Sequence, residues 1–379
     1  MAPYRLAFII GTRPEAIKLA PVIKAAQQRP MIKPVVICTG QHTDMVQPII
    51  DLFDIQPDIN LDLMTPNQSL SNLTATSLQT LNAVLGELMP DMVIVQGDTT
   101  SAFCGALASF YLAIPVAHVE AGLRSFNNQA PYPEEMNRKC ISAIASIHYA
   151  PTKQSVSHLQ NEGLPTTSII QTGNTGIDAA LTIAKSIKTT PPKLPLELAK
   201  QHDPTRPLVL ITTHRREHIG DPLLAIISAI RILATTYTDH QFLIPIHQNP
   251  RIKTPILTHL SGLDNIIICP PLAYDQLLWL MMQCTCILTD SGGIQEEAPS
   301  FKKPVFVLRE STERQEGITH QCAQIVGTKT NRIVTMVSQF LSNKANDFSF
   351  TQNPYGDGTS SEKILDHIQD WLINLTYDQ

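Results

Sequence analysis

The chain has 379 residues, more than one hydrophobic core usually organises, so its length favours two domains. A net charge of -5 gives no basic face of the kind that nucleic-acid binders carry. No apolar run approaches the roughly 18 residues that a membrane span needs, and the first residues show no signal-peptide pattern. Together with seven cysteines that form no CxxC pair, these features favour a cytoplasmic protein with reduced thiols and no nucleic-acid or membrane partner.

Short apolar runs alternate with amphipathic stretches in the first part of the chain. We expect strands at residues 6–10, 35–38, 92–95, 116–119, 147–150 and 168–171, and helices such as 14–28, 99–112 and 134–145. Continuous apolar strands that alternate with helices predict a parallel sheet covered on both faces. A cluster of prolines at residues 188–207 then predicts a linker or a peripheral excursion of the chain.

The same pattern restarts after the proline cluster. We expect strands at 208–212, 242–246, 265–269, 285–288, 305–308 and 324–326, and a last helix at 361–375. The predicted fold class is therefore α/β, with two Rossmann-like domains at residues 1–172 and 173–360. Ligands of such sheets bind at the carboxyl ends of the strands, so two of them predict a central cleft.

The first polar cluster, residues 11–16, directly follows the first strand. Gly11 allows a tight turn, and the backbone N–H groups at the start of the next helix form an anion site. Arg13 and Lys18, about one helical turn apart, add positive charge, which favours phosphate or sugar binding over an ordinary capped turn. The chain has neither GxGxxG nor GxxxxGK[ST], so nothing supports an NAD or P-loop nucleotide site.

Three acidic sites follow the next strands. Asp98 and Glu120 end successive strands, and Glu134 begins the following helix together with Glu135. A single acid at a helix start is usually a cap, because the macrodipole favours it there. Three at one sheet edge are different, because crowded carboxylates push one another's pKa values apart and so provide general acids and bases.

The second half carries a short glycine nest, Ser291, Gly292 and Gly293, at a helix start, which suits a diphosphate. Glu297, one turn further on, is placed to accept ribose hydroxyls, and Arg314 offers a third basic contact.

Residues 214–218 fit HxxEH, a zinc-protease pattern. The pattern needs both histidines on one helix face, yet here it directly follows a strand. Two adjacent arginines would also repel a dication. An anion site that includes His214, Arg215 and Arg216 explains the segment better, so we expect no metal site.

Many motifs occur in the order seen in the non-hydrolysing UDP-N-acetylglucosamine 2-epimerases, which the chain resembles over nearly its whole length. These motifs are GTRPEAIKLAPVI, TGQH, QGDTT, HVEAGLRS, PEEMNR, APT, TGNTGIDA, THRRE, HQNP, LTDSGGIQEEAPS, TERQEG and NPYGDG. The resemblance implies the GT-B fold, a homodimer, and a C-terminal helix within 361–379 that packs back on the first domain.

The resemblance also implies chemistry and site residues. A base removes the proton on carbon 2 while UDP leaves carbon 1, and UDP then adds back to 2-acetamidoglucal, with no cofactor. The positions that match the family's active-site motifs are the catalytic residues Asp98, Glu120, Glu134 and His214, and the substrate-binding residues Arg13, Lys18, Ser291, Gly292, Gly293, Glu297 and Arg314.

Alternatives remain at this stage. A GT-B glycosyltransferase would share the fold and the nest, and a related UDP-2-acetamido sugar would suit the same acids. A pure UDP-binding module is a third class. Hydrolysing epimerases carry different residues where this chain has Pro14-Glu15-Ala16, so we expect the product to keep its UDP.

The positions that the resemblance associates with regulation by a second UDP-N-acetylglucosamine are the least typical of the family in this sequence. Gln41, His42 and His247 match the candidate regulatory positions, but Asp44 and Asn67 stand where relatives have an uncharged polar residue and an arginine. We therefore expect this site to be weak or absent, and the reaction from UDP-N-acetylmannosamine to start without a lag.

Overall fold

A computed structural model describes residues 2–40, 43–65, 68–129, 131–213, 215, 218–246, 249–342 and 348–377. The chain divides into two compact units, Met1–Ala179 with Tyr355–Gln379, and Ala180–Pro354. The division falls inside one continuous helix, α7 (Thr175–Thr189).

The described part of the first unit is built on one seven-stranded parallel sheet of order β3-β2-β1-β4-β5-β6-β7. In chain order its elements are β1 (Tyr4–Ile10), α1 (Arg13–Gln27), β2 (Ile32–Cys38), α2 (Thr43–Leu52), β3 (Ile59–Asn60), α3 (Leu70–Leu88), β4 (Met92–Gln96), α4 (Thr100–Tyr111), β5 (Val116–Val119), α5 (Glu134–Ile144), β6 (Ile147–Ala150), α6 (Lys153–Asn161), η1 (Thr166–Ser168), β7 (Ile169–Gln171) and α15 (Ser360–Tyr377).

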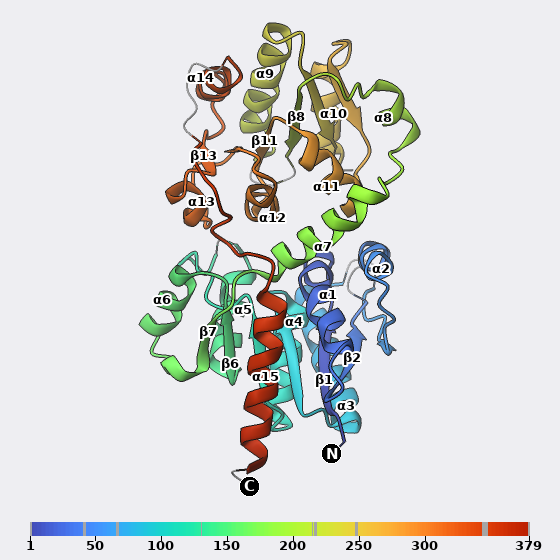
Figure 1. Ribbon diagram of the computed structural model, residues 1–379, viewed down its shortest axis with the longest axis vertical. Helices are drawn as coiled ribbons and strands as arrows, with labels where there is room; N and C mark the ends of the chain where they lie inside the picture. The colour runs from blue at the N-terminus through green and yellow to red at the C-terminus, as the bar shows by residue number, and fades with distance from the viewer. Residues whose placement is uncertain are drawn as a thin grey trace. The chain divides into compact units, whose positions relative to one another are not determined.

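Helices cover both faces of this sheet because its central strands are apolar on both sides. Residues Leu6–Ile10 of β1 are all buried. Ala7 and Ile9 face a core shared with α3, α4 and α5, which pack in a row. On the other face, α1 contacts α2 and α15 (Figure 1).

The C-terminal helix α15 is bound to the first unit by polar contacts near its start. Arg29 forms ion pairs with Glu362 at 2.5 Å and Asp366 at 2.7 Å. The N–H of Ser361, which has no partner within the helix, donates to Asp178 Oδ1 at 2.7 Å. The last residues of the chain thus complete a unit that begins with the first strand.

The described part of the second unit has a six-stranded parallel sheet of order β10-β9-β8-β11-β12-β13. Its elements are α8 (Leu196–Gln201), β8 (Leu208–Thr212), α9 (Asp221–Thr236), β9 (Gln241–Pro245), α10 (Pro250–Leu260), β10 (Ile266–Cys269), α11 (Tyr274–Gln283), β11 (Cys286–Thr289), α12 (Gly292–Glu297), η3 (Ala298–Phe301), β12 (Val305–Val307), α13 (Gln315–Thr319), β13 (Ala323–Ile325) and α14 (Thr330–Leu341).

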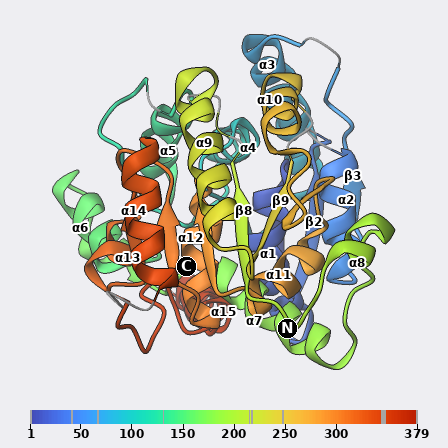
Figure 2. The same cartoon turned by 90° about the horizontal axis from the view of Figure 1, so that it is seen from above.

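One core of the second unit lies between its sheet and the helices α9, α10 and α14. Figure 2 shows α9 and α14 side by side over the strands. Three phenylalanines, Phe306, Phe340 and Phe348, pack edge to face with ring centroids 5.3–5.7 Å apart, the arrangement that aromatic quadrupoles prefer.

The predicted α/β class with two parallel sheets is confirmed. No described helix has the length and apolar character needed to cross a membrane. Both sheets have a switch point, where neighbouring strands lead to crossovers in opposite directions: between β1 and β4 in the first, and between β8 and β11 in the second. Ligands of doubly wound sheets bind at such points.

Candidate functional site

The switch point of the first sheet is closed by a tight approach of two turns. The residue after β1 is Gly11, and a Cβ at that position would lie 2.1 Å from Ser101 Oγ and 2.9 Å from Thr39 Oγ1. These two hydroxyls are themselves hydrogen-bonded at 3.0 Å. Only glycine fits there, so the chain turns directly into α1, whose first residue is Arg13. The predicted strand-to-helix turn is present.

Lys18 and Glu120, predicted separately, form an ion pair across this edge of the sheet. Lys18 Nζ donates to Glu120 Oε1, while Gln96 donates to the other carboxylate oxygen. Asn174 Nδ2 adds a bond of 3.3 Å. The backbone of Glu120 has φ 66°, in a left-handed region that non-glycine residues seldom adopt and that is enriched at functional sites.

Asp98 lies in the turn after β4 and is held by α5. Arg138 donates to its carboxylate from Nε at 2.8 Å and forms the ion pair through Nη2 at 2.6 Å. Asn137 Nδ2 donates to the Asp98 carbonyl oxygen at 2.8 Å. The sequence analysis did not identify Asn137 and Arg138, although both lie in its PEEMNR motif.

Neighbouring acids at the start of α5 have different surroundings. Glu135 is fully buried, and it accepts hydrogen bonds at 3.0 Å from the N–H groups of Ser125 and Phe126 and from Arg138. Glu134 Oε2 is also buried, but no described group hydrogen-bonds to it. Of the two, Glu134 therefore has the oxygen available for a reacting proton.

A second buried acid, Glu15, was not predicted as part of the site. Its carboxylate accepts from Gly11, Thr12 and Thr99, on the two turns that meet at the switch point. Burial raises its pKa to about 7, although these hydrogen bonds oppose the shift. The spacing Thr12-x-x-Glu15 is a capping-box pattern and could have located it.

His118 on β5 bonds to the turn that carries Asp98. Its side chain is buried, and Nε2 bonds to the carbonyl oxygen of Gly97 at 2.7 Å. Burial lowers its pKa to about 3, since the charged form would lose its hydration. His118 thus remains neutral at physiological pH and serves the turn as a fixed support.

The predicted glycine nest lies at the switch point of the second sheet. Ser291 directly precedes α12, which begins at Gly292, and its side chain makes no capping hydrogen bond. The Ser291 N–H donates to Thr289 Oγ1 at 3.0 Å, so Gly292 and Gly293 are the candidates for anion binding. A Cβ on Gly292 would lie 2.8 Å from Arg314 Cζ, so the guanidinium of Arg314 lies directly against the nest.

Polar partners fix the other two predicted residues of this unit. Arg314 Nε donates to Glu296 at 2.9 Å, and Nη1 lies 3.4 Å from Glu313. Glu297 is buried and accepts the hydroxyl proton of Tyr274 at 3.0 Å. The arrangement brings together Gly292, Gly293 and Arg314, a cation and backbone amides suited to a diphosphate.

Asp290, directly after β11, was not predicted and contacts three described residues that follow β8. The fully buried carboxylate accepts from Thr213 Oγ1 at 3.1 Å and from the Arg215 N–H at 3.0 Å. His218 Nδ1 lies 3.1 Å from the same oxygen. Arg215 Nε also donates to the Asp290 carbonyl oxygen at 2.9 Å. One aspartate thereby joins Thr213 and Arg215 to the turn that leads into the glycine nest.

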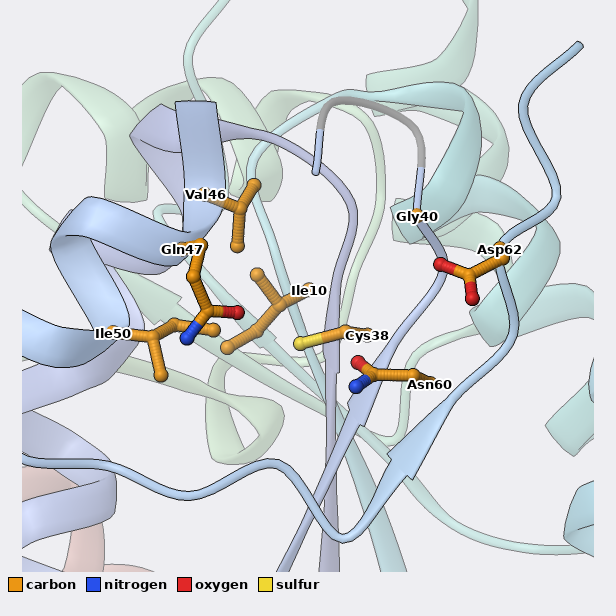
Figure 3. A pocket seen from close by; sticks show the side chains of 8 residues that line it. All are labelled: Ile10, Cys38, Gly40, Val46, Gln47, Ile50, Asn60 and Asp62. Carbon is orange, nitrogen blue, oxygen red and sulfur yellow. The ribbon is translucent and has the colours of Figure 1, made fainter. Parts of the chain in front are cut away.

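A small pocket opens beside α2 in the first unit (Figure 3). It is lined by Ile10, Cys38, Gly40, Val46, Gln47, Ile50, Asn60 and Asp62. The room for a water-sized sphere is about 10 Å³, enough for roughly one water and far below the ~300 Å³ of the smallest usual ligand sites. We assign no ligand to it.

Several predicted residues lie outside the described part of the chain. These are His214 of the candidate catalytic set and Gln41, His42 and His247 of the candidate regulatory set, together with Asn67. Within the described ranges, no group of three or more His, Cys, Asp or Glu side chains could hold a metal ion.

Known proteins resemble the chain over almost its full length. The family model described as UDP-N-acetylglucosamine 2-epimerase matches residues 24–369. A UDP-N-acetylglucosamine 2-epimerase of Escherichia coli is 41% identical over 97% of this chain and 99% of its own. The Neisseria meningitidis enzyme, solved with UDP-N-acetylglucosamine, is 39% identical with a TM-score of 0.90 over 97% of this chain and 100% of its own. An S. aureus protein solved with UDP is 40% identical with a TM-score of 0.88 over 97% of both chains.

Proposed function

The chain belongs to the UDP-N-acetylglucosamine 2-epimerase family, and we propose on this basis that it interconverts UDP-N-acetylglucosamine and UDP-N-acetylmannosamine. The proposal is supported by two acids, Asp98 and Glu120, that follow neighbouring strands of the first sheet and are each paired with a cation. Glu134 begins α5, the helix that holds Asp98. A reaction that moves a proton on and off carbon requires acids and bases at this kind of site.

The proposed reaction begins with proton removal from carbon 2. The electron pair of that C–H bond forms the C1=C2 double bond, and the C1–O bond breaks with its pair going to the β-phosphate of UDP. The intermediate is 2-acetamidoglucal. UDP then adds back to carbon 1 while a proton is delivered to carbon 2 on the opposite face. Atoms and charge balance without an external reactant.

The residues have distinct tasks in this scheme. Glu134 transfers a proton, since its Oε2 is buried and no described group hydrogen-bonds to it. Asp98 and Glu120 are held by Arg138 and Lys18 and provide the opposing carboxylates. In the second unit, Gly292, Gly293 and Arg314 bind the diphosphate, and Glu297 the ribose. Charge on the leaving UDP is stabilised by such preorganised donors.

Product analysis tests the proposed function. The protein is incubated with UDP-N-acetylglucosamine alone, and the mixture is followed by proton and phosphorus NMR. We expect UDP-N-acetylmannosamine with UDP still attached. Free N-acetylmannosamine with stoichiometric UDP would indicate a hydrolysing enzyme instead. An unchanged sugar would refute epimerisation of this substrate, and parallel incubations with related UDP-2-acetamido sugars or with an acceptor would then test the sugar alternative and the glycosyltransferase.

We also propose that two copies associate through α3. The family resemblance supports a homodimer, and α3 is unusual in carrying Glu87 as the one charged residue in its 19-residue sequence. Its exposed side includes Ala75, Gln79 and Ala83, with exposed Met89 beyond its end.

Light scattering after size-exclusion chromatography tests the dimer. We expect a dimer for the wild type and a monomer for Ala75→Glu combined with Ala83→Glu. The new carboxylates of the two copies would be buried in the proposed interface and would repel one another. Gln160→Glu, an exposed position on α6, is the matched control and should remain dimeric. A wild-type monomer at micromolar concentration would contradict the proposal.

A further inference from the structure

Glu15 is a fully buried carboxylate that the proposed mechanism does not use. Its side chain is 0% exposed. Oε2 accepts three hydrogen bonds from the turn after β1: from the N–H of Gly11 at 3.0 Å, the N–H of Thr12 at 2.6 Å and the hydroxyl of Thr12 at 2.8 Å. One oxygen therefore organises the whole turn that leads into α1.

The other oxygen of Glu15 reaches the neighbouring turn after β4. Oε1 accepts the hydroxyl proton of Thr99 at 2.5 Å. Thr99 directly follows Asp98, and its Oγ1 also caps α4 by accepting the Ala102 N–H at 3.0 Å. Glu15 is thus a direct side-chain link between the two turns of the first switch point.

The same helix turn carries one of the site's cations. Lys18 lies three residues after Glu15 on α1, and its ammonium group pairs with Glu120. The direction from which Lys18 approaches Glu120 depends on the first turn of α1, which Glu15 fixes. Side chains three residues apart on a helix lie on neighbouring parts of one face. Asp98 is therefore the chain neighbour of a direct partner of Glu15, and Glu120 is paired with a lysine on the helix whose first turn Glu15 fixes.

We infer that Glu15 is a positioning residue for the reaction, holding Asp98 through Thr99 and Glu120 through Lys18. The inference rests on the proposed function. Glu15 need not touch the substrate, because both of its carboxylate oxygens accept hydrogen bonds from the protein. A displacement of catalytic groups by about 1 Å costs on the order of a hundredfold in rate, so loss of this link should appear in turnover more than in binding.

The charge of Glu15 is part of the link. Its pKa of about 7 follows from burial, which outweighs the hydrogen bonds from Thr99, Thr12 and Gly11. Around it, Lys18 and Arg13 lie on its own helix, and Asp98 lies on the linked turn. Cys38 lies on β2, where burial and then the charges of Glu15 and Asp62 raise the thiol pKa to about 12.

Ionised Glu15 accepts the hydroxyl proton of Thr99. A proton on Oε1 would have to be donated to Thr99 instead, so protonation reverses the direction of this hydrogen bond. Turnover in the wild type should therefore fall as pH drops through the neutral range.

The test is a double-mutant cycle between Glu15 and Thr99 in the epimerisation assay. Glu15→Gln and Thr99→Val should each lower kcat at least tenfold with KM and UDP affinity within threefold. The double variant should be no slower than the slower single variant, because both changes remove one link. Thr99→Ser keeps the hydroxyl and should restore most of the lost turnover. Thr236→Val, an exposed threonine on α9 that bonds only to Ile232 in its own helix, is the matched control.

The pH profile supplies a readout that a purely structural role would not change. The decline of kcat below neutral pH should weaken or disappear in Glu15→Gln while the Thr236→Val control retains it. An active wild type whose Glu15→Gln variant keeps wild-type kcat and pH dependence would overturn the inference. Equal turnover in Thr99→Val and Thr99→Ser would do the same, even if Glu15→Gln failed to fold. A wild type without epimerase activity would instead refute the proposed function.

Discussion

Substitution of the adjacent acids Glu134 and Glu135 should separate chemistry from stability. Glu134→Gln removes a group whose buried Oε2 has no described hydrogen-bond partner, so folding loses little. Turnover should fall at least about a hundredfold, the range expected for loss of a general acid or base. UDP affinity should remain within several-fold, because the proposed UDP contacts lie in the other unit.

Glu135→Gln should have the opposite effect. Its carboxylate accepts two backbone N–H groups and pairs with Arg138, all at 3.0 Å, and the contact with Arg138 is buried. An amide keeps the shape but turns an N–H group toward a donor and removes the charge that Arg138 requires. Breaking a buried ion pair costs about 3–5 kcal/mol, and 1 kcal/mol corresponds to roughly 2–4 °C in Tm for a unit of this size. We expect Tm to fall by about 6–20 °C.

Calorimetry and steady-state kinetics on both variants make the comparison. Glu134→Gln should retain the wild-type Tm within about 2 °C and lose turnover. The main effect of Glu135→Gln should be a lower Tm. Arg138 also holds Asp98, so some loss of turnover in Glu135→Gln is expected. Near-normal turnover in Glu134→Gln, or a wild-type Tm in Glu135→Gln, would refute the assignment of the two roles.

Two further predictions concern the turn after β1. Gly11→Ala should lower the free energy of unfolding by about 1–3 kcal/mol, because its Cβ would lie 2.1 Å from Ser101 Oγ. The control is Gly86→Ala in helix α3, where the nearest atom to the new Cβ is Leu112 Cδ2 at 3.8 Å. This change should raise the free energy of unfolding by about 0.5–1 kcal/mol. Equal effects of the two changes in urea unfolding would contradict the proposed close packing at Gly11. For Glu15, burial raises the pKa from 4.5 to about 7, so the folded state binds this proton more tightly than the unfolded state does. The protonated carboxyl therefore stabilises the folded protein fully below pH 4.5, and this contribution is lost as pH rises to about 7. At 1.36 kcal/mol per pKa unit, the free energy of unfolding of the wild type should fall by ~3 kcal/mol relative to Glu15→Gln over this window, and parallel curves would disprove it.

Strand positions were predictable because buried parallel strands are continuous apolar runs. The predicted strand at 208–212 is β8 as observed, and 242–246 differs from β9 by one residue at each end. The two-residue β3 was missed, because so short a run has no pattern. Helix α8 was also missed, since it lies within the proline-rich segment 188–207, where Pro195 caps it.

Site residues at strand ends were predictable, but their partners were not. Asp98 and Glu120 are visible because polar residues end apolar strands. Arg138 and Asp290 gain their importance from contacts 40 and 75 residues away in sequence, which no local pattern records. Glu15 is an intermediate case, since the capping-box spacing marks its bond to Thr12 but not the one to Thr99.

Proton exchange at carbon 2 is the most direct test of the proposed chemistry. The protein is incubated in D2O with UDP-N-acetylglucosamine and without an acceptor, and both epimers are isolated for NMR and mass spectrometry. Removal and redelivery of the proton by the carboxylates at the first switch point predicts deuterium at carbon 2 of the UDP-N-acetylmannosamine formed. It also predicts deuterium in the recovered UDP-N-acetylglucosamine as equilibrium is approached. Epimer that forms while retaining its original hydrogen at carbon 2 would contradict this account.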